Sequence, residues 1–310
     1  MQKDLTTLGE TVRKQSYETK TGGTMLDLVF NPVTGEFEQQ NVAAGERPSG
    51  MVVTEMTKEG FANVGEPSRE ELYSRSAGLI ENGALVRKRV FIIGLGSFGG
   101  TIAIELAKAA VGEFAIMDFD KLETHNVVRH ACSLRDVGRY KTDAVEELIL
   151  GKNPYAKVDK LRLDVMEDPV ATEKEVQKSD IVIVATDNNV SRFFINELLI
   201  KYRKVGIYGR ANTRAEGGDV FIQRPDGPCY SCLIGTASFD QTAEEVSSKE
   251  AGLRSGHIAA YTAPEDAEAV VQVGLASDIA PITNLMVKLA LVELSRGTSS
   301  GISDLEEELT

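Results

Sequence analysis

The sequence has few cysteines, no long apolar run and a deficit of positive charge. Its 310 residues include three cysteines, Cys132, Cys229 and Cys232, and so small and odd a number excludes a disulfide-rich scaffold. No apolar run is long enough to cross a bilayer, and the N-terminal segment MQKDLTTLGE lacks the apolar core of a signal peptide. We therefore expect a cytoplasmic protein without a membrane partner.

The formal net charge of -13 argues against a nucleic-acid partner, because an acidic surface repels the phosphate backbone. Hydrophobic residues make up 42% of the chain and charged residues 26%, as in ordinary globular proteins. The length suits one large α/β domain with an appendage.

The chain divides near residue 70 by composition. Residues 1–70 contain few apolar side chains, and we interpret them as an N-terminal extension of low order and unknown role. Within it, residues 25–30 and 36–38 flank a turn at Asn31-Pro-Val-Thr-Gly35, which predicts a hairpin. Residues 71–310 form the main predicted domain.

The main domain alternates apolar strand patterns with helical ones. Strands are predicted at residues 89–93, 114–117, 157–163, 181–185 and 205–208, and helices at 71–82, 98–110, 142–150, 190–202 and 279–294. This alternation predicts an α/β, Rossmann-like fold, whose mostly parallel sheet has helices on both faces. Residues 225–265 show weak periodicity and are predicted to be a long crossover loop.

A glycine-rich loop, Gly94-Leu-Gly-Ser-Phe-Gly99, lies between a predicted strand and a predicted helix. Gly94 permits the tight turn, Gly96 lets a phosphate approach the backbone, and Gly99 lets the helix pack closely on the strand. Asp118, at the end of the next strand, is the expected partner of a ribose hydroxyl. The loop predicts a nucleotide ligand, and NAD is the usual one for this pattern.

The polar residues that follow favour ATP over NAD. The cluster comprises Asp118, Asp120, Asn126, Arg129, His130, Arg135, Arg139 and Lys141. Cations at this place suit nucleotidyl transfer, in which negative charge on the phosphates must be offset. Asp187 directly follows the buried strand at 181–185 and is a candidate ligand of Mg²⁺. An NAD-dependent oxidoreductase that uses the same loop is the alternative.

These motifs together resemble the ubiquitin-activating-enzyme-like family of the ThiF, MoeB and HesA type, over residues 71–297. The matching segments, in chain order, are Leu72-Tyr-Ser-Arg-Ser76, Asp118-Phe-Asp120, Asn126-Val-Val-Arg-His130, Asp136-Val-Gly-Arg-Tyr-Lys141, Asn153-Pro154, Asp180-Ile-Val-Ile-Val-Ala-Thr-Asp-Asn188 with Arg192 and Asn196, and Pro225-Asp-Gly-Pro-Cys-Tyr-Ser-Cys232. Ser97 stands where many relatives have a third glycine, and His130 where they have glutamine, but both can form hydrogen bonds.

The resemblance implies an enzyme that uses ATP and Mg²⁺ to adenylate a carboxylate, such as the C-terminus of a ubiquitin-like or sulfur-carrier protein or of a peptide. It implies that Asp118 binds ribose, that Asn126, Arg129 and Lys141 bind phosphates, and that Asp187 binds Mg²⁺. It further implies a homodimer in which Arg75 acts in the partner's site. The full set of implied nucleotide contacts is Gly94, Gly96, Ser97, Gly99, Asp118, Asp120, Asn126, Arg129, Lys141, Asp187 and Asn188.

The cysteines depart from the family pattern. Relatives hold structural Zn²⁺ with two C-x-x-C pairs, but this chain has one pair, Cys229 and Cys232, so we expect zinc to be absent. Residues 236–265 contain no cysteine that could accept an acyl group. Cys132 is expected to be a small buried residue, and the C-x-x-C sulfurs to be poor nucleophiles. The predicted reaction therefore ends at the adenylate unless Cys229 or Cys232 is free.

Overall fold

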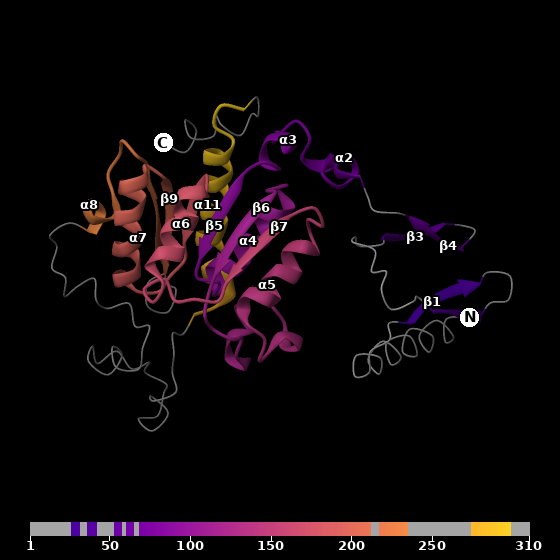
Figure 1. Cartoon of the computed structure of the whole chain (residues 1–310). Coiled ribbons are helices and arrows are strands. Elements are labelled where there is room, and N and C mark those ends of the chain that lie inside the picture. Colours follow the sequence, from indigo (N-terminus) through magenta and orange to yellow (C-terminus); the bar gives the residue numbers. More distant parts are fainter. Residues whose placement is uncertain are drawn as a thin grey trace, which may run out of the picture. The chain divides into compact units, whose positions relative to one another are not determined.

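The computed structural model describes residues 26–31, 36–41, 53–57, 60–64, 68–211, 217–234 and 274–298 (Figure 1). Contacts within the chain divide it into two compact units, Met1–Leu72 and Tyr73–Thr310. The division lies close to the compositional change near residue 70, while the role of the first unit stays open.

The first unit contains two antiparallel hairpins and a short helix. Its elements are β1 (Leu26–Asn31), β2 (Glu36–Asn41), β3 (Val53–Thr57), β4 (Gly60–Val64) and α2 (Arg69–Leu72). Strand β1 pairs with β2, which confirms the predicted hairpin, and β3 pairs with β4. The hairpin of β3 and β4 was not predicted from the sequence, because its connection, Lys58-Glu59, has neither the Gly nor the Asn of common two-residue turns. The predicted low order of the remaining residues lies outside the described part of the chain.

The second unit contains one six-stranded sheet in the order β10-β9-β8-β5-β6-β7. The strands are β5 (Arg89–Ile93), β6 (Glu113–Met117), β7 (Lys157–Leu161), β8 (Ile181–Val184), β9 (Val205–Ala211) and β10 (Gly218–Gln223). All neighbouring pairs are parallel except β9 and β10. The predicted α/β fold with a mostly parallel sheet is confirmed, with the addition of one antiparallel edge strand.

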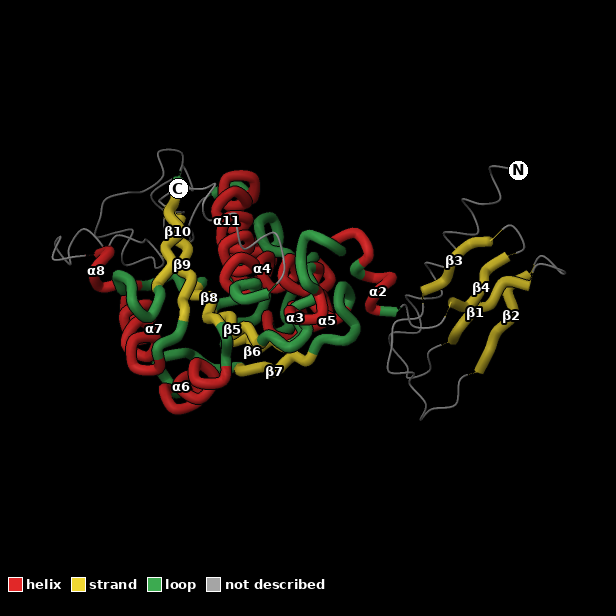
Figure 2. The backbone as a smooth tube through the Cα atoms, turned by 90° about the horizontal axis from the view of Figure 1, so that it is seen from above, coloured by secondary structure: helices red, strands yellow, loops and turns green. Residues whose placement is uncertain are grey.

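Helices cover both faces of this sheet (Figure 2). One face carries α4 (Ser97–Lys108), α5 (Lys141–Leu150) and α11 (Ala276–Leu294), and the other carries α6 (Pro169–Lys178), α7 (Asn189–Tyr202) and α8 (Tyr230–Ile234). The side chains of central strand β5 pack against the helices on both faces, because successive side chains of a strand point to opposite faces. Val90 and Ile92 pack in the first core, and Phe91 and Ile93 pack in the second.

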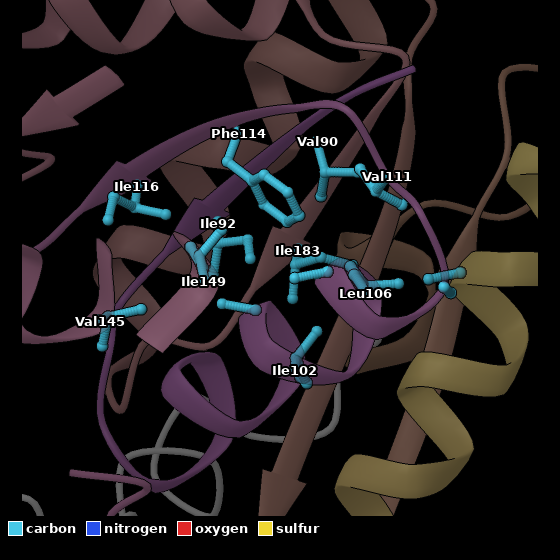
Figure 3. Packing of buried hydrophobic residues seen from close by; sticks show 14 of the residues in the cluster. Val90, Ile92, Ile102, Leu106, Val111, Phe114, Ile116, Val145, Ile149 and Ile183 are labelled. Atoms are coloured by element: carbon cyan, nitrogen blue, oxygen red, sulfur yellow. The ribbon is translucent and has the colours of Figure 1, made fainter. Parts of the chain in front are cut away.

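The continuous apolar runs of the sequence are explained by this double burial. Ile92 packs with Ile102 and Leu106 of α4 and with Val145 and Ile149 of α5 (Figure 3). Each fully buried aliphatic side chain stabilises the fold by roughly 1.5–3 kcal/mol. The core therefore holds the loops after β5, β6 and β8 on a rigid base.

Two helix predictions need correction. Residues 71–82 do not form one helix: after α2 there is a 3₁₀ turn at Ser74–Ser76, then Gly78 at a φ of 86°, then the short helix α3 (Asn82–Leu85). A positive φ cannot continue a right-handed helix. Helix α6 is absent from the sequence-based prediction, although Asp168 caps it by accepting a hydrogen bond from the Ala171 amide.

The predicted crossover loop is helical at one place. Within residues 225–265, helix α8 occupies Tyr230–Ile234, and positions 235–265 lie outside the described residues. Among the helices that the structure describes, none combines the length and the apolar character that a membrane span requires.

Candidate active site

The sheet has a switch point between β5 and β8. From β5 the chain continues to β6 and β7 on one side, and then returns to place β8 on the other side of β5. In open α/β sheets, ligands bind in the crevice that such a switch creates at the carboxyl ends of the strands. Here the glycine loop follows β5, and residues 185–189 follow β8. The two loops are close neighbours, because a Cβ atom on Gly94 would lie 2.6 Å from the Ala185 carbonyl oxygen.

Three glycines of the loop have different structural roles. Gly94 has a φ of 87°, which favours glycine, and a Cβ on Gly99 would lie 1.8 Å from the Gly94 carbonyl oxygen. Gly96 is the N-cap of α4, without a side-chain cap, and a Cβ there would meet no atom within 4 Å. Gly94 and Gly99 are therefore needed for the fold, while Gly96 leaves open space before the first turn of α4. Ser97 begins that turn and is partly exposed.

Asp118 holds the glycine loop. Its Oδ2 accepts a hydrogen bond from the Leu95 amide at 2.7 Å, and its Oδ1 accepts one from the Asp120 amide at 2.8 Å. Burial raises the pKa of this carboxyl above its ordinary value, and the nearby Lys141 ammonium opposes that rise. Each oxygen keeps a second lone pair, so Asp118 can also accept from a ligand hydroxyl.

Lys141 is the first residue of α5 and is almost wholly buried. Its Nζ lies 2.7 Å from Oδ2 of Asp120 and 3.8 Å from Oδ1 of Asp118. The Asp120 side chain is 47% exposed, so solvent weakens its hold on the lysine. The structure thus brings three predicted site residues into contact.

Arg129 differs from the other cations near the loop. Arg139, by comparison, forms ion pairs with Asp136 and Glu147. Arg129 is half-buried, burial lowers the pKa of its guanidinium, and no carboxylate pairs with it among residues 68–211, 217–234 and 274–298. Its backbone amide donates to the carbonyl oxygen of Asn126 at 3.1 Å. A half-buried cation without an anion is typical of a site for an anionic ligand.

Asn126 uses its side-chain oxygen within the protein. That oxygen accepts a hydrogen bond from the Glu123 amide at 3.0 Å, as part of a capping box of the 3₁₀ turn Thr124–Asn126. The side-chain NH₂ group donates to no other group in the described part of the chain. The residue can therefore present its NH₂ donor to a ligand while it keeps this hydrogen bond.

His130 connects the glycine loop to the Asn126–His130 segment. Its Nδ1 accepts a hydrogen bond from the Cys132 amide at 3.0 Å, so Nε2 carries the proton and donates to the Leu95 carbonyl oxygen at 2.6 Å. Burial lowers the pKa of the ring. Asp118 and His130 thus hold Leu95 by its amide and its carbonyl, respectively. The sequence shows the histidine, but nothing in it shows this link.

The loop after β8 presents Asp187 to solvent. Asn188 is the N-cap of α7 and accepts a hydrogen bond from the Ser191 amide at 2.9 Å. Arg192 secures the loop by donating to the Thr186 carbonyl oxygen at 2.5 Å. Among the described residues, exposed Asp187 is engaged only with the side-chain NH₂ of the neighbouring Asn188, which donates to its Oδ1 at 3.4 Å. Its carboxylate therefore remains available at the carboxyl edge of the sheet.

Arg75 lies apart from these residues. It is exposed in the 3₁₀ turn Ser74–Ser76, and no hydrogen bond or ion pair within the described part of the chain joins it to the predicted site. A role for it in a partner's site stays a prediction.

The three cysteines have different environments. Cys132 is buried, and burial with the nearby Asp136 carboxylate raises the pKa of its thiol to about 12, which fits the expected inert residue. Cys232 is exposed, and backbone and side-chain hydrogen bonds from Cys229 lower the pKa of its thiol. The expectation that both sulfurs are poor nucleophiles toward an adenylate stays a prediction. No cluster of three or more candidate metal ligands occurs in the described segments.

The fold and the site define a doubly wound α/β protein, with a glycine-rich loop at the switch point of the sheet, and with a buried carboxylate and a buried lysine after the second strand. The chain belongs to the ThiF family, because the sequence model of that family matches residues 73–302. This confirms the resemblance inferred from the motifs. The chain is accordingly an enzyme of a family whose named members include adenylyltransferases.

Individual relatives agree with this membership. The chain is 28% identical over 198 residues to the SAMP-activating enzyme E1 of Haloferax volcanii, covering 63% of this chain and 72% of that one. It is 31% identical over 168 residues to the adenylyltransferase and sulfurtransferase MOCS3 of Culex quinquefasciatus, covering 52% of this chain but 38% of the relative. The match thus spans well under half of that longer protein.

Solved structures show the same fold at low sequence identity. PaaA superposes with a TM-score of 0.57 at 19% identity, covering 80% of this chain and 81% of that one. MccB of E. coli superposes with a TM-score of 0.56 at 18% identity, covering 74% and 64% of the two chains.

Proposed function

We propose that this enzyme uses ATP to adenylate a carboxylate and releases pyrophosphate. The observation that supports this most directly is Arg129, a half-buried guanidinium without a carboxylate partner in the described part of the chain. Its neighbour in sequence, His130, is hydrogen-bonded to the loop that begins α4, where Gly96 leaves open space and no side-chain cap. A polyanionic ligand such as the triphosphate of ATP satisfies both features at once.

In the proposed reaction, a carboxylate oxygen of the substrate attacks the α-phosphorus of ATP. The bond from that phosphorus to the bridging oxygen of pyrophosphate breaks, which leaves an acyl-adenylate. Arg129 and Lys141 offset the negative charge that develops on the phosphates, and Asn126 donates a hydrogen bond to them. Lys141 can turn to phosphate at small cost, because its partner Asp120 is half-exposed.

The residues after β8 fit a bound Mg²⁺ ion. Hard cations of this kind are held by carboxylate oxygens and by the phosphates of the nucleotide. Asp187 offers an exposed carboxylate at the carboxyl edge of the sheet, without an ion-pair partner in the described segments. Bound Mg²⁺ would neutralise phosphate charge, while Asp187 would orient the ion.

The proposed substrate is the C-terminus of a ubiquitin-like or sulfur-carrier protein, or of a peptide. The names of relatives support this class: one is a SAMP-activating enzyme, and a structure of MccB was solved together with MccA. We further propose a homodimer in which Arg75 reaches the partner's site. Family membership removes the reason to retain the NAD-dependent alternative, since the same loop serves adenylyltransferases.

The test of this function is ATP–pyrophosphate exchange with candidate proteins that end in Gly-Gly. Asp187→Ala should abolish the Mg²⁺-dependent exchange and leave the unfolding midpoint unchanged, because the side chain is exposed. Normal exchange by this variant would exclude the role given to Asp187. Hydride transfer without pyrophosphate release would exclude adenylation itself.

A matched pair of arginines tests the phosphate site. Arg129→Ala should lower the exchange rate on the order of 10²–10³-fold, as expected for the loss of a buried group that stabilises charge. Arg135→Ala is the control, because Arg135 is exposed in the same segment and should have little effect. Equal losses in the two variants would show that general positive charge, rather than the position of Arg129, matters.

A further inference from the structure

The Cys229-x-x-Cys232 turn brings two thiols together. The Sγ atoms lie 3.4 Å apart, Cys232 is exposed and Cys229 is partly exposed. The turn itself is closed by hydrogen bonds from the amides of Cys232 and Leu233 to the Cys229 carbonyl oxygen, at 2.9 and 3.1 Å. Two thiols held this closely are suited to form a bond with each other.

The residues between the cysteines fix the turn to the core. The Tyr230 amide donates to Oδ1 of Asn196 at 3.0 Å and to Oε1 of Gln223 at 3.2 Å, and its ring stacks on Tyr208 at 4.6 Å. Asn196 also donates to Oγ of Ser231 at 3.1 Å. Little chain entropy remains to be lost when the sulfurs join, because the backbone that carries them is already ordered.

Within the described residues, the donor set around the thiols is incomplete for a metal. Structural zinc needs four N or S ligands, and no third candidate ligand accompanies the pair in the described segments. No further cysteine can complete such a site, because the remaining one, Cys132, is buried elsewhere in the core.

We propose that Cys229 and Cys232 form a reversible intramolecular disulfide by exchange with a low-molecular-weight disulfide. The Cys232 thiolate attacks one sulfur of the small disulfide, which expels a small thiolate and leaves a mixed disulfide on Cys232. The Cys229 thiolate then attacks the Cys232 sulfur and expels the second small thiolate. The protein dithiol loses two protons and two electrons, and the small disulfide becomes two thiols.

The two cysteines have unequal roles in this exchange. Cys232 is the attacking residue, because it is exposed and the hydrogen bonds from Cys229 favour its thiolate. Cys229 is less accessible and lies within reach of the Cys232 sulfur, so it resolves the mixed disulfide. This asymmetry can be tested without any assay of adenylation.

The experiment incubates the full chain with mixtures of reduced and oxidised glutathione, followed by an acid quench, alkylation in denaturant and peptide mass spectrometry. We expect the peptide that contains both cysteines to lose both alkylation sites and two hydrogen atoms, and to recover them in dithiothreitol. Cys229→Ser should accumulate a glutathione adduct on Cys232, whereas Cys232→Ser should accumulate little adduct. Cys132→Ser should behave as the wild type.

Three results would overturn the proposal. Both thiols could remain alkylated at every glutathione ratio. The two serine variants could accumulate equal adducts, which would remove the assigned roles. Finally, the purified chain could carry one equivalent of zinc that blocks oxidation, which would make the turn half of a metal site completed elsewhere in the chain. Metal analysis of the protein before oxidation distinguishes that last case.

Discussion

His130 is the residue whose importance is least visible in the sequence and most definite in the structure. Both of its ring nitrogens form hydrogen bonds to backbone groups, and one of these groups belongs to the glycine loop. Protonation of Nδ1 would replace an acceptor with a donor that faces the Cys132 amide. The folded protein therefore binds this proton less well than the unfolded chain does.

The sign of the pH dependence follows from that difference. Burial, with the Lys141 ammonium, holds the pKa of His130 below its ordinary value of 6.5, while the hydrogen bond to the Leu95 carbonyl and the Asp136 carboxylate act in the opposite direction. The stabilisation by neutral His130 is complete above the unfolded pKa and is lost as the pH falls through that value toward the folded one. Urea unfolding of the wild type should show this loss below about pH 6.5.

The matched variant is His130→Gln, which keeps a donor and an acceptor but cannot titrate. It should lack this part of the pH dependence, whereas His130→Ala should be less stable by about 1–3 kcal/mol at every pH, since it leaves two backbone groups unsatisfied. The same slope in wild type and His130→Gln would assign the titration to other groups. Sequence reasoning could establish only that histidine and glutamine can both form hydrogen bonds at this position.

At the scale of elements, the glycine loop separates the requirements of folding from those of binding. Gly99→Ala should lower the unfolding midpoint strongly, because its Cβ would lie 1.8 Å from a backbone oxygen that cannot move aside. Gly96→Ala should fold, because its Cβ meets no atom within 4 Å, but it should weaken ATP binding by occupying the space expected for phosphate.

Thermal unfolding and calorimetric titration with ATP measure the two effects separately. Gly83→Ala is the control, since its Cβ also meets nothing within 4 Å and the residue lies in α3, outside the loop. If Gly96→Ala and Gly83→Ala bound ATP equally well, the phosphate could not lie against Gly96.

An element could be predicted when the residues within it formed a recognisable pattern. Strand β5 and helix α4 could be predicted because an apolar run and a glycine pattern mark them directly. The antiparallel edge strand β10 escaped prediction because its residues are only partly buried, and its pairing with β9 depends on a distant partner. In α6, the Asp168-Pro169 start signal was present, but few apolar residues follow it, and a polar helix gives little periodicity.

At the scale of the whole chain, the order of elements was predictable because alternating strands and helices leave few topologies. The chemistry of the site was less predictable from the sequence. Sequence patterns placed Asp118, Arg129 and Lys141 at one edge of the sheet. They could not show that Lys141 is paired with Asp120, while Arg129 has no carboxylate partner among the residues that the structure describes. Pairing of this kind depends on side-chain positions that only the folded chain defines.

The proposed homodimer leads to a prediction that concerns two copies of the chain together. Arg75 is exposed and forms no hydrogen bond or ion pair with the site residues of its own chain within the described residues, so its side chain is available to act on another copy. Arg75→Ala and Lys141→Ala should each inactivate ATP–pyrophosphate exchange. A mixed dimer would keep one complete site, because the Arg75→Ala subunit retains Lys141 and receives Arg75 from its partner.

After equal mixing and random exchange of subunits, about one quarter of the wild-type rate should return, since half of the dimers are mixed and each has one intact site. The matched control mixes Arg129→Ala with Lys141→Ala. Both residues follow β6 and act in the same chain's site, so every site in that mixture stays defective and no activity should return. Recovery in both mixtures, or in neither despite subunit exchange demonstrated by mass-labelled chains, would mean that Arg75 does not act in the partner's site.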